Sequence, residues 1–240
     1  MTVTPVVHQN LSEKIYSAIK ESIVRWELRP GQRLIDGELA VQLGASRSLV
    51  RTAIGFLVND GLIEVSRRRL YVVRFSQKSI RDLLQVRHIL EMAMLPVAMA
   101  AVPTHEIEAM DARLSTAEAA FRVGDVEQFY VVDVATHQLI IEYCDNDHIK
   151  KIYANLRTQL RMVIRSDFDK QQKIFESLRE HRALIDAWKR HDERATAEAL
   201  EHHLAMAEKR VMENFAQILS DLEAEEERPP RQRRAGTRRL

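Results

Sequence analysis

The chain has 240 residues, of which 45% are hydrophobic and 30% are charged, and its formal net charge is +1. This composition is ordinary for a globular protein, and the length favours two domains over a single core. No uninterrupted apolar stretch approaches the ~18 residues of a membrane span, and the first ten residues lack the pattern of a secretory signal. The single cysteine, Cys144, cannot form an internal disulfide. We therefore expect a cytoplasmic protein that does not bind a membrane.

The charge is distributed unevenly along the chain. Residues 61–75 contain the run "RRR" and one further arginine against a single glutamate, and the last thirteen residues read "RPPRQRRAGTRRL". An arginine-rich tail of this kind cannot build a core, so we expect disorder there. Such a tail either contacts nucleic acid or only adds solubility, and the sequence leaves both open.

The first part of the chain has the pattern of a helix-turn-helix. The expected helices are 11–28, 37–43 and 47–60. Asp36 can cap the second helix and Ser46 the third, and Gly44 and Gly61 end them. Only "GAS" connects the second helix to the third. Two short helices joined by such a turn are typical of this DNA-binding motif.

Two β-rich runs, "LIEVS" and "LYVVRF", follow the third helix and predict a hairpin, or wing. Arg47 and Arg51 lie one turn apart near the start of the third helix, and Arg67, Arg68 and Arg69 occupy the tip of the hairpin. Arginine on a recognition helix can pair with guanine, whereas arginine on a wing more often contacts phosphate. The alternative is that Arg47 and Arg51 only form a solvated helix face.

The first domain resembles the DNA-binding domain of the GntR family of bacterial transcription regulators. The resemblance lies in "PGQRL", "LAVQLG", "SRSLVR" and "LVNDGLI", which follow in order between residues 30 and 63. The family usually has a glycine at the wing tip, where this chain has "SRRRLYV". The candidate DNA contacts are Arg33, Ser46, Arg47, Ser48, Arg51, Arg67, Arg68 and Arg69.

Beyond Ser79 every periodic segment predicts a helix. The expected helices are 79–102, 105–123, 125–143, 147–168, 172–190 and 193–222, with a kink at Pro96. Short connections between them indicate an antiparallel bundle. The fold class is therefore mainly α: a winged helix-turn-helix followed by an all-helical domain. The expected boundaries are a flexible arm at 1–8, a DNA-binding domain at 9–75, a helical domain at 76–222 and a disordered tail at 223–240.

Four polar residues interrupt apolar helix faces in this second part. Asp133 and His137 are spaced i,i+4, which suits two ligands of one metal ion. His181 precedes the turn at Asp192 by eleven residues and His203 follows it by eleven, so both lie ~16 Å from the turn in a helical hairpin. Taken singly, each histidine can be a hydrogen-bonded core residue, and Asp133 can merely orient His137. Their conjunction predicts a metal site.

The second part also resembles the all-helical FCD ligand-binding domain of FadR-type GntR regulators. The matching segments are "VRHILE", "DVATHQLI", "EHRALIDAW" and "HHL". By this resemblance the ligands of a divalent metal are Asp133, His137, His181 and His203. His202 is an alternative that lies off the apolar stripe. The ligand set does not choose among Zn²⁺, Ni²⁺, Mn²⁺ and Fe²⁺, and Zn²⁺ is our first expectation.

The resemblance implies a homodimeric regulator that reads a pseudo-palindromic operator and responds to a small organic acid. Arg87 is the candidate to bind the carboxylate of that acid, because its guanidinium can pair with it in a bidentate manner. The alternative for Arg87 is an i,i+4 ion pair with Glu91. A repressor that responds to metal alone, and a metalloenzyme fused to a DNA-binding module, are the competing functions. No additional acid is recognisable as a general base beside the ligands, so we expect no enzyme.

Overall fold

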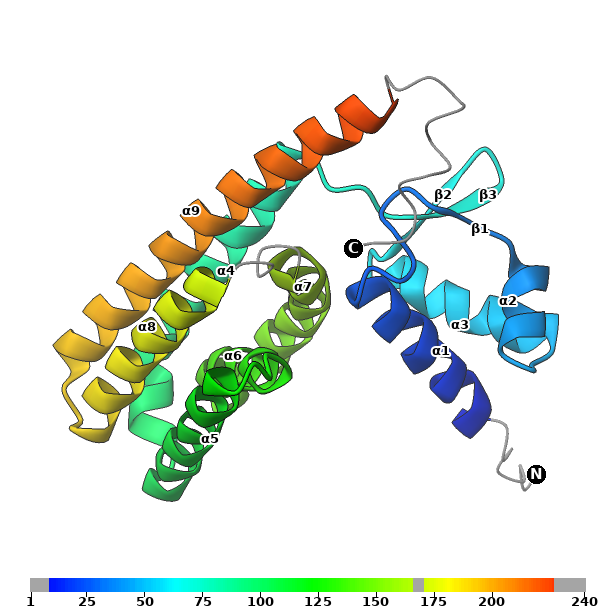
Figure 1. Ribbon diagram of the computed structural model, residues 1–240. Coiled ribbons are helices and arrows are strands. Elements are labelled where there is room, and N and C mark those ends of the chain that lie inside the picture. The colour runs from blue at the N-terminus through cyan, green and yellow to red at the C-terminus, as the bar shows by residue number, and fades with distance from the viewer. Residues whose placement is uncertain (1–8, 166–170, 227–240) are drawn as a thin grey trace, which may run out of the picture.

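The computed structural model describes residues 9–165 and 171–226, which form two domains (Figure 1). The first domain contains α1 (Gln9–Val24), β1 (Arg33–Leu34), α2 (Asp36–Gln42), α3 (Arg47–Asn59), β2 (Ile63–Ser66) and β3 (Arg69–Val72). The second contains α4 (Gln77–Ala101), α5 (Thr104–Arg122), α6 (Glu127–Glu142), α7 (Asp147–Arg165), α8 (Gln171–Lys189) and α9 (Glu193–Glu226). The expected fold, a winged helix-turn-helix followed by an all-helical domain, is confirmed.

The first domain packs α1 and α3 together and closes with a small antiparallel sheet. Ile23 on α1, Leu57 on α3 and Val72 on β3 are fully or almost fully buried in its core. The sheet order is β1-β3-β2, with Arg33 opposite Tyr71. The sequence did not predict β1, because a strand of two residues has no periodicity to detect.

The caps of the two central helices differ from expectation in one case. Ser46 caps α3 as predicted, since its hydroxyl accepts a hydrogen bond from the backbone N–H of Leu49 at 3.4 Å. Asp36 is not the cap of α2; that position belongs to Ile35, which makes no side-chain capping bond. The Asp36 carboxylate instead accepts from Arg47 and Arg51 on α3. Two guanidinium groups are stronger partners for a carboxylate than one helix N–H.

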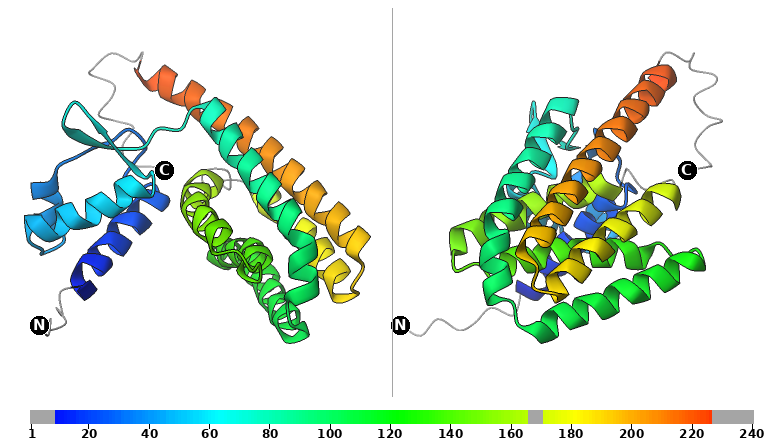
Figure 2. Two further views of the ribbon diagram at one scale, coloured as in Figure 1. Left: turned by 180° about the vertical axis from the view of Figure 1, so that it is seen from behind. Right: turned by 90° about the vertical axis from the view of Figure 1, so that its left-hand side faces the viewer.

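The second domain is a bundle around a hairpin of α8 and α9. Helix α4 lies alongside α9, and α7 is the bundle helix nearest to the first domain (Figures 1 and 2). Phe129, Ile140 and Trp188 are among its largest buried side chains. Helix α9 continues to Glu226, past the expected boundary at residue 222. The predicted N-terminal arm at 1–8 and the tail from 227 onward lie outside the described residues.

Helix α4 is long and largely apolar. Among the described residues it is the one helix long and apolar enough, by length and composition, to cross a membrane. Its inner face, however, packs against α6, α7 and α9 and holds the buried ion pair of Arg87 and Glu91. It continues through Pro96. Of its most apolar window 28% is buried, so one face of the helix packs into the bundle and the other is exposed.

The two domains share part of their cores through α7. Met162 belongs to α7, yet its side chain is fully buried in the core of the first domain. The indole N–H of Trp26 donates to the backbone carbonyl of Met162 at 3.2 Å. Lys20 donates to the hydroxyl of Thr158 at 3.0 Å. The first domain is therefore packed against α7 by apolar burial as well as by polar contacts.

We expect Met162→Ala to destabilise the first domain, although the residue lies in the second. Removing a buried methionine side chain typically costs about 2–5 kcal/mol. Hydrogen exchange of the amides of α1 and α3 should accelerate accordingly. Ile152→Ala is the matched control, because Ile152 on the same helix is 53% exposed and its loss should change little. Equal protection of α1 and α3 in both variants would show that α7 does not support the first domain.

Candidate functional site

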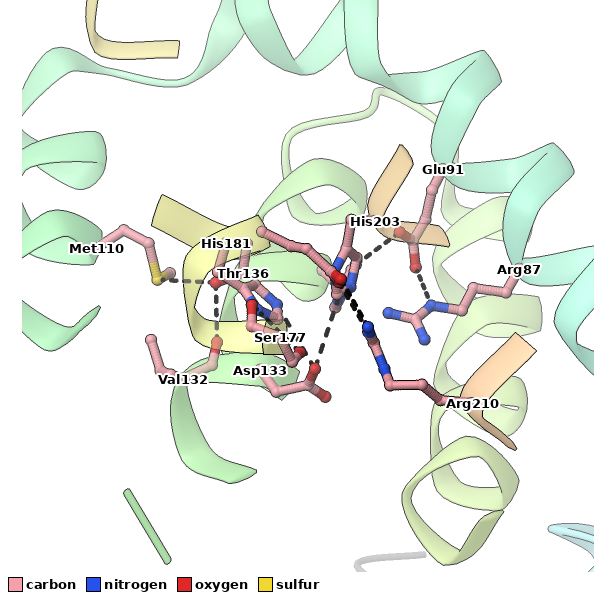
Figure 3. Close-up of polar contacts among 12 residues, drawn as sticks. Arg87, Glu91, Met110, Val132, Asp133, Thr136, Ser177, His181, His203 and Arg210 are labelled. Atoms are coloured by element: carbon pink, nitrogen blue, oxygen red, sulfur yellow. Dashed lines mark hydrogen bonds and ion pairs between the residues drawn. The ribbon is translucent and has the colours of Figure 1, made fainter. Parts of the chain in front are cut away.

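Four buried residues converge inside the second domain. Within the described residues, the candidate ligand atoms of Asp133, His137, His181 and His203 all lie within 4.8 Å of one another. Asp133 and His137 come from α6, His181 from α8 and His203 from α9. All four residues are buried. Figure 3 shows Asp133, His181 and His203 facing one interior space. The structure thus brings together the four residues that the sequence singled out.

The helical hairpin places two of these residues at the same level. The rings of His181 and His203 have centroids 4.3 Å apart, as their equal separation from the α8–α9 turn predicts. Exposed His202, the alternative ligand, points away from the interior. His137 approaches from α6, and its Nε2 lies 3.1 Å from Nε2 of His203. Three imidazole groups from three helices therefore meet.

The outer nitrogen of each ring contacts a hydrogen-bond acceptor. These contacts are His137 Nδ1 to Glu91 Oε2 at 2.7 Å, His203 Nδ1 to Glu180 Oε2 at 2.9 Å and His181 Nδ1 to the Ser177 carbonyl at 2.8 Å. An acceptor at Nδ1 selects the tautomer that carries its proton there. The Nε2 atoms of the three rings face the shared space, and an unprotonated Nε2 is a form of histidine that binds metal.

One ligand atom of this cluster has no hydrogen-bond partner among the described residues. This atom, Nε2 of His181, is buried and lies 3.5 Å from Oδ1 of Asp133. Nε2 of His137 and Nε2 of His203 lie within hydrogen-bonding distance of each other. Burial lowers the pKa of His181 to about 4, with Asp133 opposing this shift, and burial lowers the pKa of His203 well below its usual value. A cation held by all four groups would satisfy them together.

The spacing and the charge both fit a divalent ion. Ligand atoms at ~2.1 Å from a metal lie about 3.0–3.4 Å apart in octahedral or tetrahedral geometry. The distances of 3.1 Å between two Nε2 atoms and 3.5 Å from His181 Nε2 to Asp133 are close to that range, whereas His137 Nε2 lies 3.9 Å from Asp133 and the ligand atoms as a set lie within 4.8 Å of one another. With neutral imidazole rings, the carboxylates of Asp133, Glu91 and Glu180 and the guanidinium groups of Arg87 and Arg210 sum to one negative charge. A divalent ion would turn this into one positive charge.

An outer layer of charged groups holds the ligand rings. Arg210 donates to both carboxylate oxygens of Glu180, at 2.6 and 2.7 Å (Figure 3 shows Arg210). Arg87 and Tyr153 both donate to Oε1 of Glu91, at 2.9 and 2.6 Å. Burial acts to raise the pKa of Glu91, but His137 and Arg87 lower it to about 2. Glu91 therefore stays ionised, and the contacts of Glu91 and Glu180 keep His137 and His203 oriented.

Sequence reasoning missed most of this layer. Glu180 precedes His181 in "EHRAL", but the histidine that it contacts is His203, on the next helix. Arg210 lies seven residues beyond His203. A spacing of seven places two residues on one helix face, so this pair carried a usable signal. The pairing across α8 and α9 could not be found without the packing of the two helices.

The structure places Arg87 in the ion pair with Glu91, one of the two roles open from the sequence. Its Nε atom makes that contact, and the side chain is buried. Figure 3 shows the end of its guanidinium group directed toward the interior that contains His203. The ion pair leaves the terminal nitrogens for a second acceptor, because Arg has five N–H donors.

The candidate DNA contacts form an exposed surface on the first domain. All eight of them are exposed: Arg33, Ser46, Arg47, Ser48, Arg51, Arg67, Arg68 and Arg69. The side chains of Arg47 and Arg51 are 63% and 67% exposed, although both pair with Asp36. Hydrogen bonds from Arg51 and Arg47 lower the pKa of Asp36, which therefore stays ionised. Asp36 fixes the direction of two arginines that would otherwise sample many rotamers.

The wing tip is a tight turn made of arginine. Ser66 pairs with Arg69, which leaves Arg67 and Arg68 as a two-residue loop with φ of +49° and +61°. Positive φ at both positions matches the I′ turn preferred in hairpins, which usually takes Asn or Gly. Arg67 and Arg69 also line a surface hollow of about 430 Å³, together with Arg74, which was not among the candidate DNA contacts. Arg67 and Arg68 therefore occupy positions whose backbone conformation favours glycine.

Comparisons with known proteins agree with both halves of this description. Residues 11–73 match the model of "Bacterial regulatory proteins, gntR family", and residues 82–206 match that of the FCD domain. The transcriptional repressor RspR of Escherichia coli is 26% identical over 82% of this chain and 86% of its own length. The structure of E. coli McbR/YncC superposes with a TM-score of 0.73 at 19% identity, over 90% of this chain and all of that one. The metal-free FCD domain of TM0439 superposes with a TM-score of 0.53 at 21% identity, over 60% of this chain and 99% of that one.

If the cluster holds a metal, His181→Ala combined with His203→Ala should remove most of it. Two of four ligands would be lost, and elemental analysis of the purified protein measures the metal content directly. His202→Ala is the matched control, since His202 is exposed beside His203 and should leave the content unchanged. Equal metal content in all three proteins would refute the metal assignment.

Replacing the strained arginine Arg68 by glycine should affect stability and DNA binding in opposite directions. The left-handed conformation costs an L-residue roughly 1–2 kcal/mol, so Arg68→Gly should raise the melting temperature of the first domain. If Arg68 contacts phosphate, the same change should reduce the slope of log binding constant against log salt concentration by about one. Arg68→Lys retains both charge and strain, and it should change neither measurement.

Proposed function

The chain belongs to the GntR family of bacterial regulatory proteins and carries an FCD domain, and on this premise we propose that it is a homodimeric, metal-containing regulator whose affinity for operator DNA is changed by a small organic acid. It is a DNA-binding transcriptional regulator, and the relatives named above are described as regulators. The observation that carries the finer proposal is the convergence of three imidazole rings and one carboxylate on a buried space.

The exposed arginine surface supports DNA contact by α3 and the wing. Helix α3 begins at Arg47, directly after its cap, so Arg47 and Arg51 project from its N-terminal end. A recognition helix contacts base edges mainly through that end. The wing arginines lie on the same exposed surface, away from the start of α3, and we expect them to contact DNA phosphates. The expected target is a pseudo-palindromic operator in the cytoplasm.

The outer face of α4 supports a homodimer. Val86, Ile89 and Val97 are 41%, 57% and 42% exposed, and their spacing of three and eight residues places them along one stripe of the helix. An apolar stripe of this kind on a soluble protein usually marks an interface. A second copy of the chain is the expected partner, because two first domains are needed to read two half-sites.

The charge of the metal site supports an organic acid as effector. With a divalent ion the buried groups would carry one net positive charge, which favours a ligand with a carboxylate. A bound metal would supply open coordination positions to such a ligand. Arg87, directed toward the same interior, would pair with the carboxylate and hold it beside His203. Zn²⁺ remains our first expectation because histidine and carboxylate ligands suit it.

A repressor that responds to metal alone is the second candidate, favoured by the same four ligands. The two differ in what releases DNA. Release by metal without organic acid would favour the metal sensor, whereas release only when a small carboxylate is added would favour the organic-acid regulator. The FCD domain of TM0439 has been solved in a metal-free form, which is consistent with a metal that can be removed from such domains.

We expect Arg47→Ala and Arg51→Ala each to weaken specific DNA binding by roughly five- to 150-fold. A bidentate contact between arginine and guanine is worth about 1–3 kcal/mol of discrimination. The DNA can be obtained by selection from a random pool with the wild-type protein, and affinity measured by gel shift. Arg113→Ala, which removes an exposed arginine of α5, is the control and should retain binding. Unchanged binding in all three variants would remove the basis for this DNA interface.

A further inference from the structure

A cavity of about 200 Å³ lies between the two domains, and the proposed function does not account for it. Its wall is formed by Glu21 and Val24 of α1, by Arg25 in the turn that follows α1, by Glu127, Tyr130, Val131, Asp133 and Val134 of α6, and by Arg161 and Ile164 of α7. Asp133 is therefore shared between this cavity and the candidate metal site, and it is the one candidate ligand that lines the cavity. The cavity lies between Asp133 and the helix that begins the DNA-binding domain.

The wall is polar in two places and apolar in others. One polar region is Asp133, where a divalent ion would add positive charge. The other is formed by Arg25 and Arg161, which carry guanidinium groups, and the wall also contains the carboxylates of Glu21 and Glu127. The apolar lining consists of Val24, Val131, Val134 and Ile164. The volume is below the ~300–1,000 Å³ typical of sites for drug-sized ligands, so a ligand must be small. A short carbon chain with an acidic group at each end matches this wall.

A carboxylate of the chain itself already occupies the arginine region. The two terminal nitrogens of Arg161 donate to the two oxygens of Glu21 at 3.0 and 3.2 Å. Arg25 lies 3.9 Å from Glu21. The side chains of Arg161 and Glu21 are 31% and 42% exposed, and ion pairs at this exposure contribute little to stability because water screens them. A ligand carboxylate can replace Glu21 at low cost.

We propose that this cavity is a binding site for a small dicarboxylate, one end of which meets the metal site at Asp133 while the other replaces Glu21 on Arg161. The metal end of this inference rests on the proposed function. The arginine end rests on the ion pair of Glu21 and Arg161, in which the metal takes no part. The ligand class is thereby narrowed from an organic acid to one with two acidic groups.

Such a ligand would act on the contact between the domains. Glu21 belongs to α1 of the DNA-binding domain and Arg161 to α7 of the bundle, so their bridge is one of the contacts that join the domains. A ligand that takes Arg161 removes this contact, while Met162 stays in the shared core. The ligand would then bind more tightly to an arrangement with a loosened first domain, and this difference in affinity is what can shift DNA binding.

The two partners of the ion pair should respond to mutation in opposite directions. Calorimetric titration of the full-length, metal-loaded protein with glutarate is the test. Arg161→Gln should weaken glutarate binding at least ten-fold, because the ligand loses its bidentate partner. Glu21→Gln should strengthen it several-fold, because the competing carboxylate is gone. Arg157→Gln is the control: Arg157 is on the same helix, contacts Gln138 and is outside the cavity wall, so it should bind glutarate as the wild type does.

A purely structural ion pair would give another result, since loss of either partner would then have the same sign. Weaker or unchanged binding in Glu21→Gln, or wild-type binding in Arg161→Gln, would overturn the site. Butyrate, with a single carboxylate, should bind more weakly than glutarate, and equal affinity would overturn the dicarboxylate class. Metal content and gel shift on the same preparation test the proposed function separately. A protein that carries metal and binds DNA but shows no glutarate binding would contradict this inference alone.

Discussion

The interior of the second domain is organised around a cluster of buried polar groups, among which Nε2 of His181 has no hydrogen-bond partner within the described part of the chain. Asp133, His137, His181 and His203 direct one ligand atom each into a shared buried space. Burial makes this costly, because unpaired polar groups away from water lose their hydration without compensation. The outer contacts from Glu91, Glu180 and the Ser177 carbonyl orient the three rings, because each lies at Nδ1, on the side away from the shared space. The bundle therefore contains a buried cluster that could hold a metal ion.

Helix α7 links this centre to the DNA-binding domain. Tyr153 contacts Glu91, which orients His137, and Met162 lies in the core of the first domain. Arg161 belongs to the same helix and makes the ion pair with Glu21. Because a helix is a stiff element, a displacement at one end of α7 is transmitted to the other. The contacts also show a graded strength: the buried methionine is a firm attachment, and the half-exposed ion pair is one that a ligand can exchange.

Local signals made much of this fold and site predictable. Helix periodicity, the cap at Ser46 and the arginine-rich hairpin indicated a winged helix-turn-helix. His181 and His203 could be paired by counting residues from a turn, because a helical hairpin converts equal distance along the chain into equal height. The prediction that Asp36 caps α2 was wrong. Its sequence position suits a helix cap, but two arginines from α3 offered stronger partners, and which partner prevails depends on three-dimensional proximity.

The sequence by itself determined the order of the elements, the family resemblance, the four candidate ligands and the exposed arginines. These features depend on residues close together in the chain or on the regular geometry of helices. Only the tertiary structure decided that Glu180 supports the histidine of the neighbouring helix, that Met162 completes the core of another domain and that Arg161 faces Glu21 across a cavity. Each is a contact between segments whose relative placement is set by the packing of whole helices, and no local pattern encodes it.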